Sequence, residues 1–197
     1  MTVLHSARLR FEPVTDAHYD GMRALNGDPE VMRYITGQPE TPEETRAVIA
    51  RVKARWGTLG YSWWNFIEQD TGELVGAGCI QHLGHDPANA HEIGWRLRPD
   101  RWGRGYAIEA AERMARFAFD DLAAPLLCAI CEPANLRSAR VMEKLGMRLR
   151  GEEPWHGRMT LVYEIDRAAW QERGKGQERL DGRNDNWATP PGETRHL

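Results

Sequence analysis

The chain has 197 residues, of which 41% are hydrophobic, and its 26 basic and 29 acidic side chains leave a formal charge of −3. This length suits one domain with a substantial core, and the well-mixed charges argue against nucleic acid as the main partner. No apolar run approaches the roughly 20 residues that span a bilayer, and residues 1–10 carry no cleavage signature, so we expect a cytoplasmic protein without a membrane partner.

Hydrophobic patterning predicts a first half that runs from a strand through two helices into a strand meander. Residues 7–14 alternate as a strand, and residues 16–25 follow as a short helix. The tetrapeptide Thr41-Pro42-Glu43-Glu44 is a capping box with proline at the first helical position, so it opens a second helix. Three antiparallel strands come next, the first two joined by the turn Asp70-Thr71-Gly72, at residues 61–69, 73–82 and 90–97.

The second half alternates helices and strands. In chain order we expect a helix at residues 108–119, a strand at 126–131, a helix at 136–145 with Asn135 as its N-cap, and two closing strands at 147–153 and 158–166. This order predicts one α+β domain on a single mixed sheet over residues 1–170. Beyond it, a composition rich in Gly, Arg, Gln, Asn and Asp predicts a flexible tail over residues 171–197.

A glycine-rich turn joins the strand at residues 90–97 to the helix that follows. Its sequence, Arg101-Trp102-Gly103-Arg104-Gly105-Tyr106-Ala107, lets backbone N–H groups converge at a helix N-terminus, which adds roughly half a positive charge. The turn has neither the phosphate-loop spacing of nucleoside triphosphatases nor the Gly-x-Gly-x-x-Gly spacing of dinucleotide sites. We therefore expect a phosphate or pyrophosphate ligand of another kind. The arginines that crowd this turn are Arg96, Arg98, Arg101 and Arg104.

The three cysteines, Cys79, Cys128 and Cys131, invite a metal or redox interpretation because two of them form a Cys-x-x-Cys pair. That pair lies in an apolar run that we interpret as a strand. Residues three apart in a strand point to opposite faces, so the two thiols cannot share a metal ion. We expect buried free thiols and no metal site.

Four segments between residues 92 and 147 have a familiar sequence and order. They are Glu92-Ile93-Gly94-Trp95-Arg96-Leu97, Trp102-Gly103-Arg104-Gly105-Tyr106-Ala107-Ile108-Glu109-Ala110, Asn135-x-x-Ser138 and Glu143-Lys144-Leu145-Gly146-Met147. Together they resemble the GNAT acetyltransferase superfamily, and within it the RimJ/RimL branch. The superfamily signature of Gln or Arg, two residues, Gly, one residue, then Gly or Ala falls on Trp102, Gly105 and Ala107. Tryptophan at the first position departs from the general pattern and is familiar in that branch.

The resemblance covers residues 7–170 and implies a three-layer α/β/α fold. Its central mixed, mostly antiparallel sheet would splay at the acyl-CoA site and be flanked by helices. Acetyl-CoA is the implied donor, with its pyrophosphate on the backbone amides of the turn and its pantetheine arm along the preceding strand. The implied cofactor-binding residues are Trp95, Arg96, Leu97, Arg98, Trp102, Gly103, Arg104, Gly105, Tyr106, Ala107, Asn135 and Arg140.

The family reaction moves an acetyl group directly from a thioester to a primary amine. It needs a base for the amine, a donor for the oxyanion and an acid for the departing thiolate. The resemblance implies a backbone N–H near Trp95 as the oxyanion donor and Ser138 as the acid, and Glu92 is the candidate base. A purely structural carboxylate is the other interpretation of Glu92. The alternatives for the base are Glu132, His91 and His82.

The leading acceptor is the N-terminal amine of a peptide or protein, as in the ribosomal-protein acetyltransferases of that branch. A small amine, including an amino acid or an amine-bearing antibiotic, is the alternative. A CoA-binding sensor without transfer activity is the hypothesis from a different class. We expect a monomer or homodimer. Candidate acceptor contacts are the outward-facing member of the pair Trp63 and Trp64, together with Trp155, His156, Asp28 and Glu30.

Overall fold

The computed structural model describes residues 1–184 of the chain, with side chains through residue 175. The described residues form one sheet of eight strands in the order β1-β2-β3-β4-β5-β6-β8-β7. All neighbouring strands are antiparallel except β5 and β6, which are parallel, as expected for a mixed, mostly antiparallel sheet. The strands are β1 (Leu4–His5), β2 (Leu9–Pro13), β3 (Trp63–Glu68), β4 (Leu74–His82), β5 (His91–Leu97), β6 (Leu126–Cys131), β7 (Arg148–Trp155) and β8 (Arg158–Asp166).

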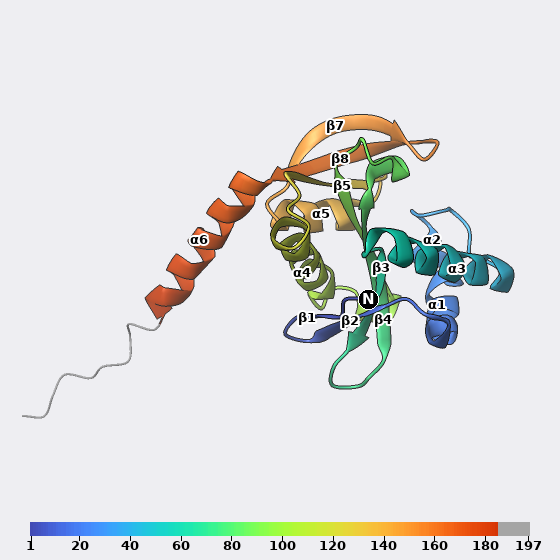
Figure 1. The fold of residues 1–197 in the computed structure, drawn as a ribbon. Coiled ribbons are helices and arrows are strands. Elements are labelled where there is room, and N and C mark those ends of the chain that lie inside the picture. The colour runs from blue at the N-terminus through green and yellow to red at the C-terminus, as the bar shows by residue number, and fades with distance from the viewer. Residues whose placement is uncertain (185–197) are drawn as a thin grey trace, which may run out of the picture.

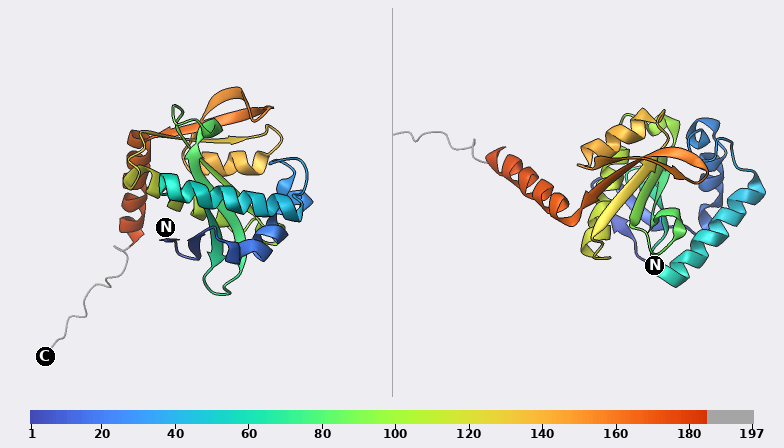
Figure 2. Two further views of the ribbon diagram at one scale, coloured as in Figure 1. Left: turned by 45° about the vertical axis from the view of Figure 1, so that its right-hand side comes forward. Right: turned by 90° about the horizontal axis from the view of Figure 1, so that it is seen from above.

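Helices cover both faces of this sheet, which confirms the three-layer α+β architecture. Helices α4 and α5 lie on one side and α1 to α3 on the other (Figures 1 and 2). Short 3-10 turns η1 (Asp16–His18), η2 (Leu83–His85) and η3 (Pro99–Arg101) connect the elements. The helices are α1 (Tyr19–Asn26), α2 (Pro29–Met32), α3 (Pro42–Leu59), α4 (Tyr106–Asp120), α5 (Leu136–Lys144) and α6 (Arg167–Asn184).

The sheet opens between its two parallel strands. β5 pairs with β6 at only two positions, His91 with Leu127 and Glu92 with Cys128. From residue 93 onward β5 stays paired with β4 on its other edge, while its β6 edge has no strand partner. The predicted splay is therefore present, and it begins immediately after Glu92.

Strand alternation separates the adjacent tryptophans of β3, as their spacing predicts. Trp64 is fully buried between the rings of Trp56 and Phe117, with ring centroids 5.0 Å and 5.6 Å away. Trp63 points to the opposite face, where the guanidinium carbon of Arg96 lies 4.5 Å from its ring centroid. Arg55 of α3 contacts Gln81 on this second face, which also carries side chains of the site described below.

Three features differ from the sequence-based expectations. Strand β1 and helix α2 were not predicted, because two and four residues are too short for a periodicity to appear. A helix, α6, also continues through Asn184, where a flexible tail is expected from residue 171. The side chain of Asp166 accepts the N–H of Ala169 at its start, and no proline interrupts it. The remainder of that expected tail, residues 185–197, lies outside the described residues.

The capping box of α3 is present as predicted, and it gives a test of the fold. The Thr41 hydroxyl accepts the N–H of Glu44 at 3.2 Å, and the Glu44 carboxylate accepts the N–H of Thr41 at 2.7 Å. We expect Thr41→Ala to lower the free energy of unfolding by about 1 kcal/mol, measured by urea denaturation. The control is Thr58→Ala in the exposed last turn of α3, with an expected change within about 0.5 kcal/mol. Equal effects of the two substitutions would contradict a capping role.

Candidate active site

A groove of about 960 Å³ runs through the splay of the sheet. It is bounded by β5, the glycine-rich turn, α4 and α5, and on the other side by α2 and the residues after it. Most of the residues predicted from the resemblance therefore meet in one place. Those that line the groove are Trp95, Arg96, Leu97, Trp102, Gly103, Gly105, Tyr106, Ala107, Asn135, Ser138 and Arg140.

The turn presents bare backbone at the N-terminus of α4. Gly103 and Gly105 have positive φ angles of 74° and 82°, a conformation that favours glycine. Gly105 is the N-cap residue and makes no side-chain cap, and a Cβ placed on Gly103 would meet nothing within 4 Å. The first N–H groups of α4 are therefore left to an external acceptor at the positive end of the helix dipole. This environment fits a pyrophosphate.

Two carboxylates, Glu68 and Glu73, hold the glycine-rich turn in place through hydrogen bonds and ion pairs. Glu68 accepts a hydrogen bond from the Tyr106 hydroxyl and pairs with Arg101 at 3.5 Å. Glu73 accepts from Arg101 at 2.7 Å and from Arg98 at 3.2 Å. These two arginine side chains are held by acidic partners, so they hold the shape of the turn. Arg98 does not line the groove, whereas Arg101 does.

Arg104 also does not line the groove. Its carbonyl accepts a hydrogen bond from Arg8 at 2.9 Å, and Arg8 is itself paired with Glu109 of α4 at 2.7 Å. This contact ties the turn to the loop between β1 and β2.

A basic stripe on α5 faces the same groove and was not predicted in full. Arg137, Arg140 and Lys144 line it from successive turns of one helix, and only Arg140 was assigned from the resemblance. The spacing of three and four residues in the sequence is the signal that could have found the other two. The guanidinium carbon of Arg137 lies 4.6 Å from the ring centroid of Trp102, which carries the first position of the signature. Cations at this place suit the phosphates of a nucleotide cofactor.

Asn135 and Ser138 lie together at the start of α5. The Asn135 side chain accepts the N–H of Ser138 at 3.3 Å, which confirms its predicted N-cap position. Both residues line the groove next to the splayed strand. The amide nitrogen of Asn135 and the hydroxyl of Ser138 have no partner among the hydrogen bonds of the described residues, so both can reach a ligand.

Glu92 lies at the apex of the splay but does not line the groove itself. It is 6% exposed, and the amide nitrogen of Gln81 donates a 3.1 Å hydrogen bond to its carboxylate. Arg55 of α3 donates in turn to the oxygen of Gln81 at 3.4 Å. Burial raises the pKa of Glu92 to about 7, and the Gln81 hydrogen bond opposes that shift. A carboxylate with this pKa can exchange a proton near neutral pH.

The alternative bases are engaged elsewhere. Glu132 forms an ion pair with Arg158. The His91 ring lies 2.9 Å from the Tyr61 hydroxyl and its centroid is 4.4 Å from that of His82. His91 is also the strand neighbour of Glu92, so its side chain leaves β5 on the opposite face. None of these three residues lines the groove.

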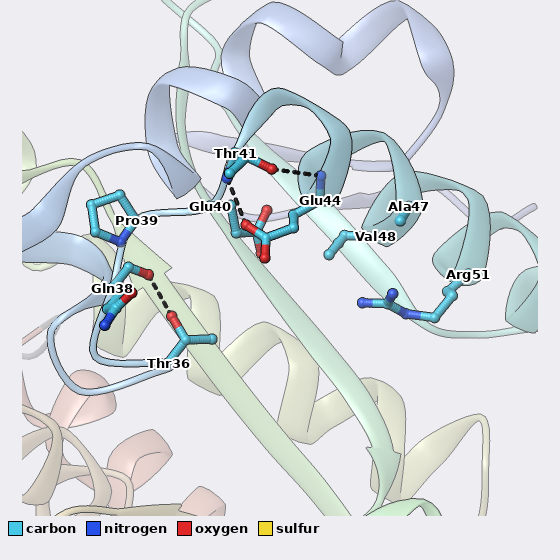
Figure 3. A pocket seen from close by; sticks show the side chains of 9 residues that line it. All are labelled: Thr36, Gln38, Pro39, Glu40, Thr41, Glu44, Ala47, Val48 and Arg51. Atoms are coloured by element: carbon cyan, nitrogen blue, oxygen red, sulfur yellow. Dashed lines mark hydrogen bonds between the residues drawn. The ribbon is translucent and has the colours of Figure 1, made fainter.

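A second hollow of about 500 Å³ lies beside the start of α3 (Figure 3). It adjoins the connection from α2 to α3, and its wall combines carboxylate, hydroxyl, amide and guanidinium groups. The residues that line it are Thr36, Gln38, Pro39, Glu40, Thr41, Glu44, Ala47, Val48 and Arg51. Figure 3 shows Arg51 extending along the same side of the helix as Val48 and Ala47.

The other candidate acceptor contacts are dispersed. Asp28 caps α2 by accepting the N–H of Glu30 at 2.8 Å, whereas Glu30 lines the large groove. Trp155 packs over Gly84 of η2 and donates to Glu153, and His156 lies 6.0 Å from His85 between ring centroids. The turn between β7 and β8 therefore closes against η2 and lines neither hollow.

The cysteines are all buried free thiols. Cys128 packs in a small cluster with Leu83 and Val162, whereas Cys131 packs in the main core, so the two lie on opposite faces as the strand periodicity predicts. Among the side chains of residues 1–175, no group of three or more His, Cys, Asp and Glu could hold a metal ion. No helix in that part of the chain is long and apolar enough to cross a membrane.

Comparison with known proteins assigns the chain to a family. A family model described as an acetyltransferase (GNAT) domain matches residues 8–148, which is more than half of the chain. The chain therefore belongs to the GNAT acetyltransferase family and is an acyltransferase of the N-acetyltransferase type. The FsC-acetyl coenzyme A-N(2)-transacetylase of Aspergillus fumigatus is 31% identical over 153 residues, which cover 73% of this chain and 64% of that protein.

Solved structures agree on the fold. A crystal structure of an acetyltransferase from Agrobacterium tumefaciens is 29% identical, covers 85% of this chain and 95% of that one, and superimposes with a TM-score of 0.74. RimL, a ribosomal alpha-N-protein acetyltransferase solved with coenzyme A, superimposes with a TM-score of 0.72 over 85% of this chain and 99% of its own. It is only 17% identical, so it shows the shared fold and not a shared acceptor.

The glycine turn offers a matched test of cofactor binding. Gly103 and Gly60 are both exposed, have φ angles of 74° and 76°, and leave open space at Cβ. Only Gly103 lies at the N-terminus of α4, so we expect Gly103→Asp to weaken CoA binding at least about tenfold through charge repulsion. Gly60→Asp introduces the same backbone strain elsewhere and should leave the Kd unchanged, as measured by isothermal titration calorimetry. Similar Kd values for the two variants would count against the cradle.

The buried carboxylate makes stability depend on pH. Between the ordinary pKa of 4.5 and about 7, the folded protein keeps a proton on Glu92 that the unfolded chain has lost, so stability falls as the pH rises through this window. Glu92→Gln keeps a side-chain oxygen that accepts the hydrogen bond of Gln81, and it removes the cost of ionising a buried carboxyl group. We expect it to be more stable than the native protein by roughly 3 kcal/mol at pH 8, with no difference near pH 4. Urea unfolding at both pH values measures this, and the exposed Glu152→Gln is the control.

Proposed function

We propose that this enzyme transfers the acetyl group of acetyl-CoA to a primary amine that reaches the splay from the α1–α3 side of the sheet. The observation that carries this proposal is the juxtaposition of two features at the same opening. On one side lies the uncapped N-terminus of α4 with the basic stripe of α5, and at the apex lies the buried Glu92.

The lining of the groove suits the chemical groups of acetyl-CoA. The N–H groups of residues 103–107 and the cations of α5 suit the phosphates, because both supply positive charge at one end. The free edge of β5 beyond residue 93 leaves backbone groups for the amides of the pantetheine arm. The part of the groove between the phosphate end and the splayed strand is lined by Trp95, Leu97, Asn135 and Arg140. Bound acetyl-CoA supplies the acetyl group as a thioester, whose C–S bond breaks as the N–C bond of the product forms.

Three groups of the chain serve this exchange. Glu92 accepts the proton that the acceptor amine loses, directly or through a water molecule, because its pKa of about 7 lies close to physiological pH. The backbone N–H of β5 near Trp95 holds the thioester oxygen as negative charge develops on it. The Ser138 hydroxyl donates a proton to the departing sulfur. It recovers the proton from solvent after the product leaves.

Two classes of acceptor are considered, a peptide or protein N-terminal amine and a small amine. A peptide or protein N-terminal amine follows from the RimJ/RimL resemblance, but the support from solved ribosomal-protein acetyltransferases is limited to 17–18% identity. The relative at 31% identity has a printed name that describes acetyl transfer to an N(2) position of FsC. One structural observation, the unpartnered Arg96 analysed below, favours a small acceptor with a carboxylate.

The test is the release of CoA thiol from acetyl-CoA across a panel of amines, with Glu92→Gln and Ser138→Ala as variants. We expect Glu92→Gln to lower kcat by about 100-fold and to remove the rise of the native rate through pH 7. Ser138→Ala should lower kcat as well. Both variants should keep the native Kd for CoA, and Glu152→Gln should keep native kinetics.

Two results would overturn the proposal. Tight CoA binding without transfer to any amine would instead indicate a sensor module. A native pH profile in Glu92→Gln would remove Glu92 from the chemistry.

A further inference from the structure

A buried cation without a partner lies in the centre of the site. Arg96 is 8% exposed, and its Nε has no hydrogen-bond partner. No salt bridge or hydrogen bond among the described residues involves its guanidinium. Burying a charge is costly unless it is paired, and the cost lowers the pKa of this arginine through desolvation. The guanidinium therefore has its full hydrogen-bonding capacity available for a ligand.

The Trp63 ring orients the side chain of Arg96. Its guanidinium lies over the Trp63 ring at 4.5 Å, a cation–π contact that orients the group without using its N–H donors. Arg96 lines the large groove together with residues of α2, so the group borders the acceptor side of the splay. Glu40 acts on it only through space and is already bonded by Asn26 at 2.8 Å and Thr45 at 3.1 Å.

A second unpartnered polar group lies in the same cross-strand row. The register pairs Asn65 with Ala77 and Ala77 with Arg96, so these three side chains share one face. Asn65 is fully buried, and neither its amide oxygen nor its amide nitrogen has a partner. Of this row only Arg96 lines the groove, and Asn65 and Ala77 lie fully buried behind it.

The same face places Glu92 and Arg96 on either side of a glycine. Residues 92, 94 and 96 alternate along β5, so successive side chains lie roughly 7 Å apart along the strand. A Cβ on Gly94 would meet only the sulfur of Cys79, at 3.4 Å. Gly94 thus leaves space for a carbon-sized group between the carboxylate at the apex and the guanidinium that lines the groove.

We propose that Arg96 binds the carboxylate of the acceptor and that the acceptor is a free α-amino acid. The inference rests on the proposed function and specifies its substrate. An α-amino acid carries a cationic amine and a carboxylate on one carbon, and it complements the buried base and the buried cation together. A carboxylate accepts two parallel hydrogen bonds from a guanidinium, which fixes the orientation of the amine. The register turns the backbone of Arg96 toward Ala77 of β4 and the backbone of Trp95 and Leu97 toward the splay, so the pantetheine arm and the acceptor carboxylate use different residues.

The experiment compares acceptors that differ only in the carboxylate. Each of the twenty common amino acids is assayed with acetyl-CoA beside its carboxamide, and kcat/KM is measured for both. For the amino acids that react, we expect the acid to exceed the amide by at least about tenfold. Transfer at equal rates to acid and amide would overturn the inference and leave the proposed function standing. Transfer to none of the compounds, nor to other amines, would overturn both.

Variants separate substrate binding from a structural role. Arg96→Met keeps an apolar stem on Trp63 and should abolish the preference for the acid, chiefly by raising KM. Arg96→Lys keeps a cation and should retain part of the preference. A loss of kcat for acid and amide alike would indicate an oxyanion role instead.

Stability gives a readout that needs no bound ligand. Removing an unpaired buried cation should raise the unfolding midpoint of the free protein, whereas breaking a structural ion pair would lower it. The surface substitution Arg116→Met on α4 removes the same charge and should change neither the midpoint nor the acceptor preference. A lowered midpoint in Arg96→Met would contradict the assignment.

Discussion

The separation of β5 from β6 is the constraint on which the rest of the structure depends. Two parallel strands that pair at only two residues leave the following backbone groups without sheet partners. Unpaired backbone polar groups are tolerated only where water or a ligand can satisfy them, so the splay must be a binding site or a solvated cleft. The glycine turn, the bare N-terminus of α4 and the basic stripe of α5 all adjoin this opening, which makes one end of it suited to an anion.

The opening also explains why opposite charges are buried in a mostly apolar sheet. Glu92 lies at the last paired position of β5, and Arg96 lies four residues further along the splayed edge, on the same face. Each charge carries a desolvation cost that the extensive core under α3 and α4 offsets. Residues that reduce stability in this way are typical of functional sites, where a shifted pKa or a free donor serves a ligand.

Sequence periodicity predicted most of the fold because the helices and strands are long enough to show their period. Strand β6 and the capping box of α3 were located to the residue, and the glycine turn was identified from Gly103 and Gly105. The role of Arg96 as a side chain was not predicted. Its environment arises from Trp63, more than thirty residues earlier, and from a register that no local pattern encodes. The partner of Glu92, Gln81, likewise becomes its neighbour only through β4–β5 pairing.

The position of the buried cation bears on the choice between peptide and amino-acid acceptors. In a peptide, the group next to the N-terminal amine is a neutral amide, and it would leave the guanidinium without a hydrogen-bonded counter-charge, because Glu40 acts on it only through space. A site built around a charged group discriminates strongly against an analogue that lacks the complementary charge, because its own donors then stay unpaired. Specificity by charge therefore follows from one arginine on the splayed strand, independently of the size of the acceptor side chain.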